Sequence, residues 1–169
     1  MSTPVSGTYP AYFENYIQLV DTASVKEAIE KYSTPINDFF TDINEEKAIY
    51  RYEENKWSTK ELLQHLIDAE RIFAFRALSL ARGEKASLPG FEENEYASAS
   101  QADKRSWKSL IEEFIACRKS TDLLLLSFTE DQLQQSGITN SKPNTVVAIA
   151  YVMIGHILHH MKVVEERYL

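Results

Sequence analysis

Cysteine, glycine and proline are scarce in this chain. One cysteine, five glycines and five prolines occur among 169 residues. A single cysteine cannot form an internal disulfide, and the apolar neighbours of Cys117 indicate a buried or half-buried helical position. No alternating pattern is long enough to predict a strand, which favours an all-α protein. The following glycines and prolines fall between segments of regular hydrophobic spacing: Gly83, Pro89, Gly90, Gly137 and Pro143.

Positive charge is also in short supply. Lysine and arginine together number 18 against 25 aspartates and glutamates, which gives a formal net charge of -7 and an isoelectric point near 5.2. Binding to a nucleic-acid backbone requires clustered lysine and arginine side chains. We therefore expect no nucleic-acid partner.

No hydrophobic run is long enough to cross a membrane. The longest, residues 146–158, is shorter than the roughly 18 residues that a span requires, and it contains His156. It predicts a buried helix and no membrane partner. The first ten residues lack a cationic segment followed by an apolar one, so they do not resemble a secretory signal. We expect a cytoplasmic location.

The length and composition are those of one globular domain. Hydrophobic residues make up 44% of the chain and charged residues 25%, which is an ordinary balance for a protein with its own core. We predict a single domain over residues 1–169, in which residues 1–15 form an N-terminal arm.

Hydrophobic side chains at helical spacing predict a first long helix over residues 24–41. Pro35 lies inside this pattern. It either kinks the helix or begins a second helix capped by Ser33 or Thr34. We favour the kink.

The second predicted helix has the clearest boundaries. Ser58 and Glu61 have the spacing of a capping box, in which each side chain bonds a backbone N–H at the helix start. Hydrophobic residues then recur at steps of three and four, and Arg82 with Gly83 marks a plausible end.

The rest of the chain predicts a long loop and two more helices. Residues 84–99 form a loop that is long for a helical bundle, and such loops are often functional. Ser100, with Asp103 three residues later, predicts the start of a third helix that reaches residue 127. A fourth helix begins near Asn144 and continues almost to the end. The expected architecture is an all-α four-helix bundle.

Three of the four histidines lie within five residues, which is the strongest chemical signal in the sequence. On a helix His156 and His160 point the same way, one turn apart, and can present two imidazole nitrogens to one ion. His159 is rotated away from them. His65 occupies a core-facing position of the second helix and can complete a triad with the pair.

Two interpretations of these histidines stay open from the residues alone. Three neutral imidazoles around a divalent ion leave a position for water or substrate, as in catalytic zinc sites, and nickel, iron(II) or manganese are also compatible with them. Alternatively the bundle holds no metal, and His65 and His160 hydrogen-bond each other across the core.

Several segments resemble the DinB/YfiT-like superfamily. The stretch from Lys56 to Arg71, KWSTKELLQHLIDAER, is similar to the second helix of these proteins, and the GHILHH run beginning at Gly155 is similar to their last-helix motif. The Arg82-Gly83 pair and the LPGF segment beginning at Leu88 also resemble members of the superfamily.

The resemblance implies a fold, a ligand set and an oligomeric state. Members form an antiparallel four-helix bundle that is commonly dimeric. A histidine of their second helix joins the first and last histidines of an H-x-x-H-H run around a metal. Carried over to this chain, the ligands are His65, His156 and His160, without His159, and the protein is a homodimer.

The resemblance also implies a class of activity. Members with assigned functions include S-transferases that use low-molecular-weight thiols such as bacillithiol, mycothiol or glutathione, as well as amide-bond hydrolases and isomerases. We therefore expect a metal-dependent thiol S-transferase or hydrolase that acts on a small molecule, with a thiol as a conceivable cosubstrate. The alternative is a metal-binding or dimerising bundle without catalysis.

Several charged residues are candidates to assist such a metal. Asp68 lies one turn beyond His65, and Glu93 belongs to the long loop together with Glu92 and Tyr96. Asp68 and Glu93 are the predicted acid/base residues, although both are also explained as solvated charges. Arg76 lies on the seam of His65, where it either binds an anionic substrate or forms a structural salt bridge.

Overall fold

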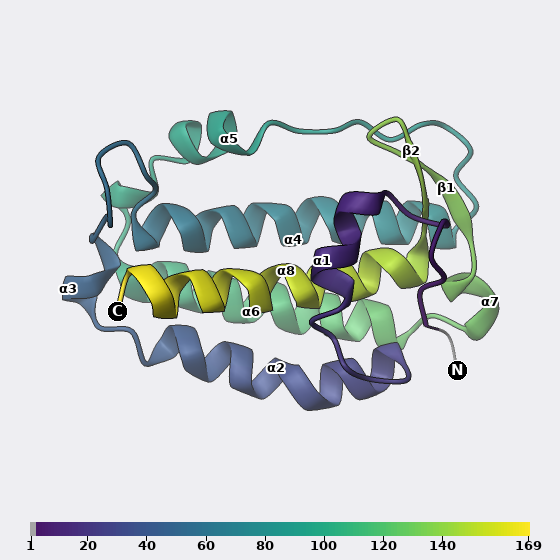
Figure 1. Ribbon diagram of the computed structural model, residues 1–169, viewed down its shortest axis with the longest axis horizontal. Helices are drawn as coiled ribbons and strands as arrows, with labels where there is room; N and C mark the ends of the chain where they lie inside the picture. Colours follow the sequence, from purple (N-terminus) through teal and green to yellow (C-terminus); the bar gives the residue numbers. More distant parts are fainter. Residues whose placement is uncertain (1–2) are drawn as a thin grey trace.

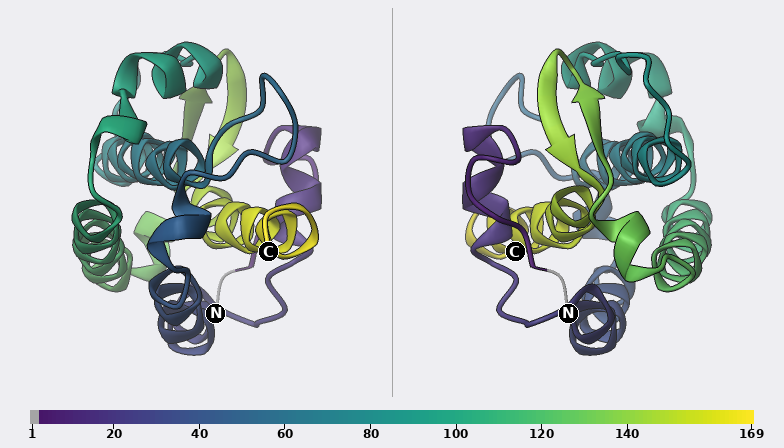
Figure 2. Two further views of the ribbon diagram at one scale, coloured as in Figure 1. Left: turned by 90° about the vertical axis from the view of Figure 1, so that its left-hand side faces the viewer. Right: turned by 90° about the vertical axis from the view of Figure 1, so that its right-hand side faces the viewer.

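A computed structural model describes residues 3–169 and confirms the four-helix bundle. Within this range α4 packs on α6 and α8, and α2 packs on the same two helices. The end views in Figure 2 show all four around one core. The long helices are α2 (Val25–Thr41), α4 (Thr59–Ala81), α6 (Trp107–Leu126) and α8 (Val146–Arg167).

Short elements precede α2 and occupy the connections between the long helices. The helical ones are η1 (Ala11–Phe13), α1 (Glu14–Ile17), α3 (Glu45–Ala48), α5 (Glu93–Ser100), η2 (Ala102–Lys104) and α7 (Glu130–Leu133). A two-stranded antiparallel hairpin consists of β1 (Ser136–Thr139) and β2 (Lys142–Thr145).

The connection between α4 and α6 runs the length of the bundle. In Figure 1 it leaves one end of α4, passes above that helix and descends at the opposite end. As a consequence α4 and α6 point in the same direction, whereas α2 and α8 point in the other (Figure 1). The neighbouring helices α4 and α8 are therefore antiparallel, which decides how His65 meets the C-terminal histidines.

The starts of two helices were predicted correctly, α2 from hydrophobic spacing and α4 from its capping box, and a side-chain cap is present at both. Ser24 caps α2 by accepting a hydrogen bond from the N–H of Glu27. Ser58 and Glu61 form the reciprocal capping box at the start of α4. Pro35 lies inside the continuous helix α2, so the alternative of a second helix beginning there is wrong.

The predicted start of the third helix at Ser100 is wrong. Helix α6 begins at Trp107, where the Ser106 side chain accepts a hydrogen bond from the N–H of Ser109. Asp103 does not cap a helix, because its carboxylate accepts hydrogen bonds from the hydroxyl of Ser58 and from Arg51. The Asp103 side chain, which suggested a local cap, therefore forms tertiary hydrogen bonds instead.

Residues 84–99 are not wholly a loop, and the absence of strands was predicted wrongly. Helix α5 begins inside that range at Glu93, and the β1–β2 hairpin precedes α8. Asn140 and Ser141 form its two-residue turn with φ of 49° and 60°, as a type I′ turn requires. The backbone of Leu88 bonds to Ile138 and Asn140, which attaches the long connection to the hairpin.

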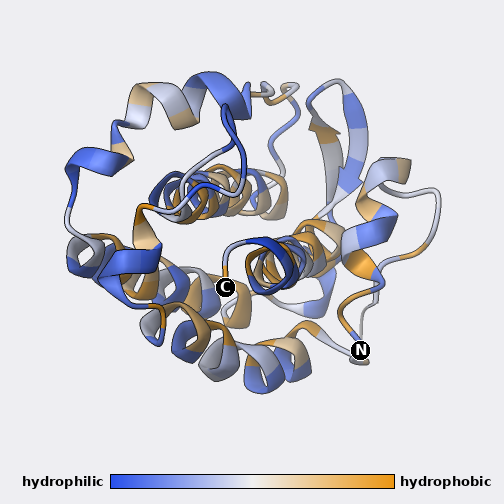
Figure 3. Cartoon of the chain, turned by 60° about the vertical axis from the view of Figure 1, so that its left-hand side comes forward, coloured by the Kyte–Doolittle hydropathy of each residue, from blue (hydrophilic) through white to orange (hydrophobic). Residues whose placement is uncertain are grey.

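Helix α8 is the central element of the core. Each residue from Val146 to Ile157 is buried. The whole helix of 22 residues is longer than its apolar run suggested and would suffice by length and composition to cross a membrane, yet 67% of the relevant window is buried inside the protein. This confirms the prediction of a buried helix. The amphipathic helix α2, in contrast, alternates between hydrophilic and hydrophobic positions (Figure 3).

Gly155 allows the N-terminal arm to contact α8. A Cβ atom at this position would overlap the backbone carbonyl of Tyr16 in α1. Because this neighbour is backbone, it cannot move aside as a flexible side chain can. The glycine therefore fixes how closely α1 approaches the helix that carries His156.

Gly155→Ala is expected to destabilise the protein by about 1–3 kcal/mol through overpacking, although alanine favours a helix by about 1 kcal/mol. Chemical denaturation and limited proteolysis of the N-terminal arm measure the effect. Gly83→Ala is the control, because this position has positive φ but nothing within 4 Å. Both variants should lose stability, but only Gly155→Ala should expose the arm to protease. Unchanged stability of Gly155→Ala would contradict the close contact.

Candidate metal centre

The three predicted ligands come from two adjacent helices. His65 lies in the second turn of α4, and His156 and His160 lie one turn apart on α8. His65 and His156 are buried, with exposed fractions of 7% and 9%, and His160 is half-buried. Burial of three imidazoles together requires either hydrogen bonds among them or a shared ion.

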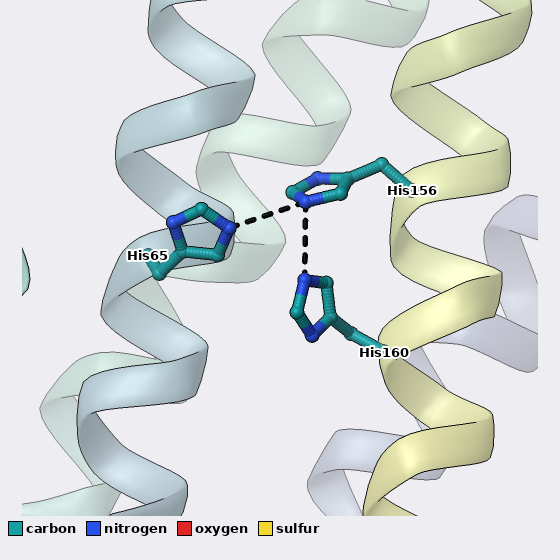
Figure 4. Close-up of side chains that lie close together, drawn as sticks. All are labelled: His65, His156 and His160. Carbon is teal, nitrogen blue, oxygen red and sulfur yellow. Dashed lines mark hydrogen bonds between the residues drawn. The ribbon is translucent and has the colours of Figure 1, made fainter. Parts of the chain in front are cut away.

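Their Nε2 atoms converge on one point (Figure 4). The Nε2 atom of His156 lies 3.1 Å from that of His65 and 3.1 Å from that of His160. One nitrogen from each residue lies within 4.8 Å of the other two. Zinc binds imidazole nitrogens at about 2.0–2.1 Å, so ligand atoms roughly 3–3.5 Å apart suit a common ion.

Hydrogen bonding alone does not satisfy this arrangement. A ring nitrogen of a neutral imidazole either donates one proton or accepts at one lone pair. The Nε2 atom of His156 faces both neighbours and cannot pair well with each. The pairing of His65 with His160 that the metal-free alternative proposed is not the one found, because both short contacts involve His156.

The environment of the three histidines favours their neutral, unprotonated form. Burial lowers the pKa of His65 to about 4, against the opposing charge of Glu93. Burial and then His65 lower the pKa of His160 to about 3, and burial also lowers the pKa of His156 well below its ordinary value. All three rings are neutral at pH 7, and neutral imidazoles are the form that binds metal.

Aromatic rings hold the triad in place. Trp57, at the start of α4, lies 4.8 Å from the ring of His65 between centroids. Tyr16 of the N-terminal arm lies 5.4 Å from His156 and 5.4 Å from His159. His159 itself is exposed and stands outside the converging group.

The triad forms part of the wall of a cavity of about 460 Å³. This is within the usual size of a small-molecule pocket, roughly 300–1,000 Å³. Further side chains come from η1 and α1, from α4 and the residue before its cap, from the long connection, from the hairpin turn and from α8. They are Tyr12, Phe13, Tyr16, Trp57, Ala69, Phe73, Arg76, Phe91, Glu92, Glu93, Asn140, Val152 and His159.

Sequence reasoning missed the contribution of the N-terminal arm. Tyr12 and Phe13 of the arm and Tyr16 directly after it line the cavity, although none of them was assigned a role from the sequence. Three aromatic residues so close together in a short segment were the available signal. The neighbouring sequence contains no signal that these aromatic residues pack against the last helix.

The two predicted acid/base residues lie in different places. Glu93 lines the histidine cavity, and its charge acts on His65 and on Tyr16. Asp68 instead lines a separate hollow, where it accepts a hydrogen bond from Gln64. Their catalytic roles stay predictions, and only Glu93 is placed to act beside the triad.

Comparison with known proteins identifies a family and proteins of similar fold. The model of the DinB superfamily matches residues 35–164. A search of curated proteins finds no significant match. YfiT from Bacillus subtilis, described as "a probable metal-dependent hydrolase with an unusual four-helix bundle topology", has a similar structure with a TM-score of 0.72. Its sequence is 13% identical, and the match covers 98% of this chain and 90% of YfiT.

A mycothiol-dependent maleylpyruvate isomerase also has a similar structure, with a TM-score of 0.66 and 10% sequence identity. The match covers 96% of this chain but 62% of the isomerase, so the chain spans less than two thirds of that protein. At these identities the two likenesses establish the fold alone.

Proposed function

The chain belongs to the DinB superfamily, and from this premise we propose that it is a metal-dependent enzyme that acts on a small molecule. The observation that carries the proposal is the convergence of three neutral Nε2 atoms at the wall of a cavity. His65, His156 and His160 would hold one divalent ion, with zinc, nickel, iron and manganese all compatible.

The chemistry follows from a site with three protein ligands. A divalent ion bound there would lower the pKa of water or a thiol in the remaining position. The aromatic side chains of the cavity wall would contact the apolar part of the substrate. Glu93 would accept the proton, because its carboxylate lies near His65 at the cavity edge.

Two reactions fit a metal site with a neighbouring carboxylate. Both begin with the attack of a deprotonated nucleophile on an electrophile. Hydrolysis is supported by the description of YfiT. Transfer to a low-molecular-weight thiol is supported by the mycothiol-dependent neighbour. A metal-binding bundle without catalysis is the alternative, but an accessible cavity beside the triad favours catalysis. The homodimer and the cytoplasmic location stay predictions.

An activity assay with reconstituted metal tests the proposal. Chelator-treated protein is supplied with zinc, nickel, manganese or iron(II) and assayed for hydrolysis of aryl esters and anilides. In parallel, we measure whether the protein catalyses the attack of glutathione, bacillithiol or mycothiol on an electrophilic dye, in which the thiol sulfur displaces the leaving group of the dye. We expect turnover that requires the metal.

Glu93→Gln should lower that turnover by about 100-fold or more, the usual contribution of a positioned base, while metal content stays the same. Glu92→Gln is the matched control, because Glu92 is also exposed in the cavity wall but does not affect the pKa of His65. Stoichiometric metal without turnover in any assay would support the non-catalytic alternative.

A further inference from the structure

Arg76 is a buried cation that has no anionic partner among the described residues. Only 5% of its surface is exposed. Among residues 3–169 it forms no ion pair, so the salt bridge considered at this position is not found. No carboxylate in this part of the chain contributes to the shift of its pKa, which burial lowers. An isolated buried charge is costly and calls for a counter-ion.

The contacts of Arg76 satisfy only part of the hydrogen-bonding capacity of its guanidinium. Its Nη2 donates to the backbone carbonyl of Pro89 at 2.6 Å. Its Nε is buried and has no acceptor among the described residues. The group also lies 5.5 Å above the ring of Phe73. A carbonyl oxygen and an aromatic face stabilise the cation partly, but neither neutralises it.

Arg76 shares the cavity of the histidine triad. It follows His65 on α4 by eleven residues, which is about three turns and about 16 Å along the helix, on the same face. Long helical side chains point back toward the N-terminus, which brings the guanidinium closer to the triad. Phe73 lies between the two, with its ring 6.4 Å from that of His156.

We propose that Arg76 binds the carboxylate of a small organic acid whose other end reaches the histidine triad. A guanidinium offers a planar pair of donors that matches a carboxylate. The aromatic side chains of Tyr12, Phe73 and Phe91 provide apolar contacts for the body of the molecule. This inference deepens the proposed function by assigning the substrate class, and it rests on that function.

The exposed acids at the cavity make this anchor necessary for an anionic ligand. Glu92 and Glu93 line the same cavity and repel a carboxylate. The guanidinium of Arg76 in the same cavity wall would offset this repulsion and set the orientation of the acid. The carboxylate would then lie against Arg76, and the reacting group would lie near His65 and Glu93.

Binding to metal-free protein tests the inference, because a carboxylate could otherwise bind the metal. The probes are 3-phenylpropionate and its neutral isostere 3-phenylpropionamide, titrated by calorimetry into chelator-treated protein. The wild type should bind the acid about tenfold or more tightly than the amide. Arg76→Gln, which keeps an N–H donor for Pro89 but removes the charge, should lose this preference. Arg76→Lys should retain part of it, since the charge remains.

The outcomes separate this inference from the proposed function. Equal affinity of the wild type for acid and amide would overturn the inference, whether or not the Arg76→Gln variant folds. Unchanged acid binding in a folded Arg76→Gln variant would also overturn the inference. Arg76 would then have only the structural role of binding the backbone carbonyl of Pro89. Selective acid binding without metal-dependent turnover would instead uphold the inference and count against the enzyme.

Discussion

Protein that carries His156→Ala and is purified without a histidine tag is expected to lose the one equivalent of divalent metal that the wild type retains. His156 is the central member of the triad, because its Nε2 atom lies 3.1 Å from the Nε2 atoms of both other histidines. Loss of an outer residue that orients a ligand typically weakens metal affinity 10- to 100-fold. Loss of a ligand itself should exceed about 100-fold.

Elemental analysis and calorimetric titration with zinc measure this loss. His65→Ala and His160→Ala should behave in the same way, and His160 is less buried, so its variant is the safer one for folding. His159→Ala is the matched control, because His159 neighbours His160 in sequence but is exposed outside the triad. A second readout is thermal stability, since a ligand at 1,000 times its Kd stabilises the native state by about 4 kcal/mol.

Only the wild type and the His159→Ala variant should gain this stabilisation from added zinc. Full metal retention by the His65→Ala and His160→Ala proteins would reject the triad. Absence of metal from the wild type after addition of zinc, nickel, manganese and iron(II) would leave a helical bundle with core histidines and remove the case for an enzyme.

Arg118→Met is expected to destabilise the protein by about 3–5 kcal/mol, the usual cost of leaving buried charges unpaired. Arg118 is 1% exposed and bonds Glu70 and Asp122, each at 2.5 Å. Ser33 donates to the other oxygen of Asp122 at 2.7 Å, so the network joins α2, α4 and α6. Methionine would fill the space but leave two buried carboxylates without a cation.

Chemical denaturation of the Arg118→Met variant measures this effect against a matched control. Arg71→Met removes an ion pair with Glu113 that links α4 and α6, but the Arg71 side chain is 53% exposed. Exposed pairs contribute about 0–1 kcal/mol, so the control should change little. Similar stabilities of the two variants would show that burial does not set the strength of the Arg118 network.

The segments that the sequence predicted well carry their signals within a few residues. The capping box of Ser58 and Glu61 forms between neighbours on the chain, so it specifies the start of α4 in any bundle. The i, i+4 spacing of His156 and His160 places both rings on one side of α8 by helical geometry alone. The start of the third helix was predicted wrongly, because Asp103 accepts a hydrogen bond from Ser58, which lies 45 residues earlier in the chain, rather than from a local N–H.

The sequence by itself therefore determined the helical class, the burial of α8 and the histidine pair, because periodicity and capping act over one or two turns. Tertiary structure alone decided that His65 meets this pair, that the N-terminal arm covers it and that Arg76 has no carboxylate partner among residues 3–169. Each of these depends on which helix faces pack together. That choice is made by burial of apolar surface over the whole domain, which no short pattern encodes.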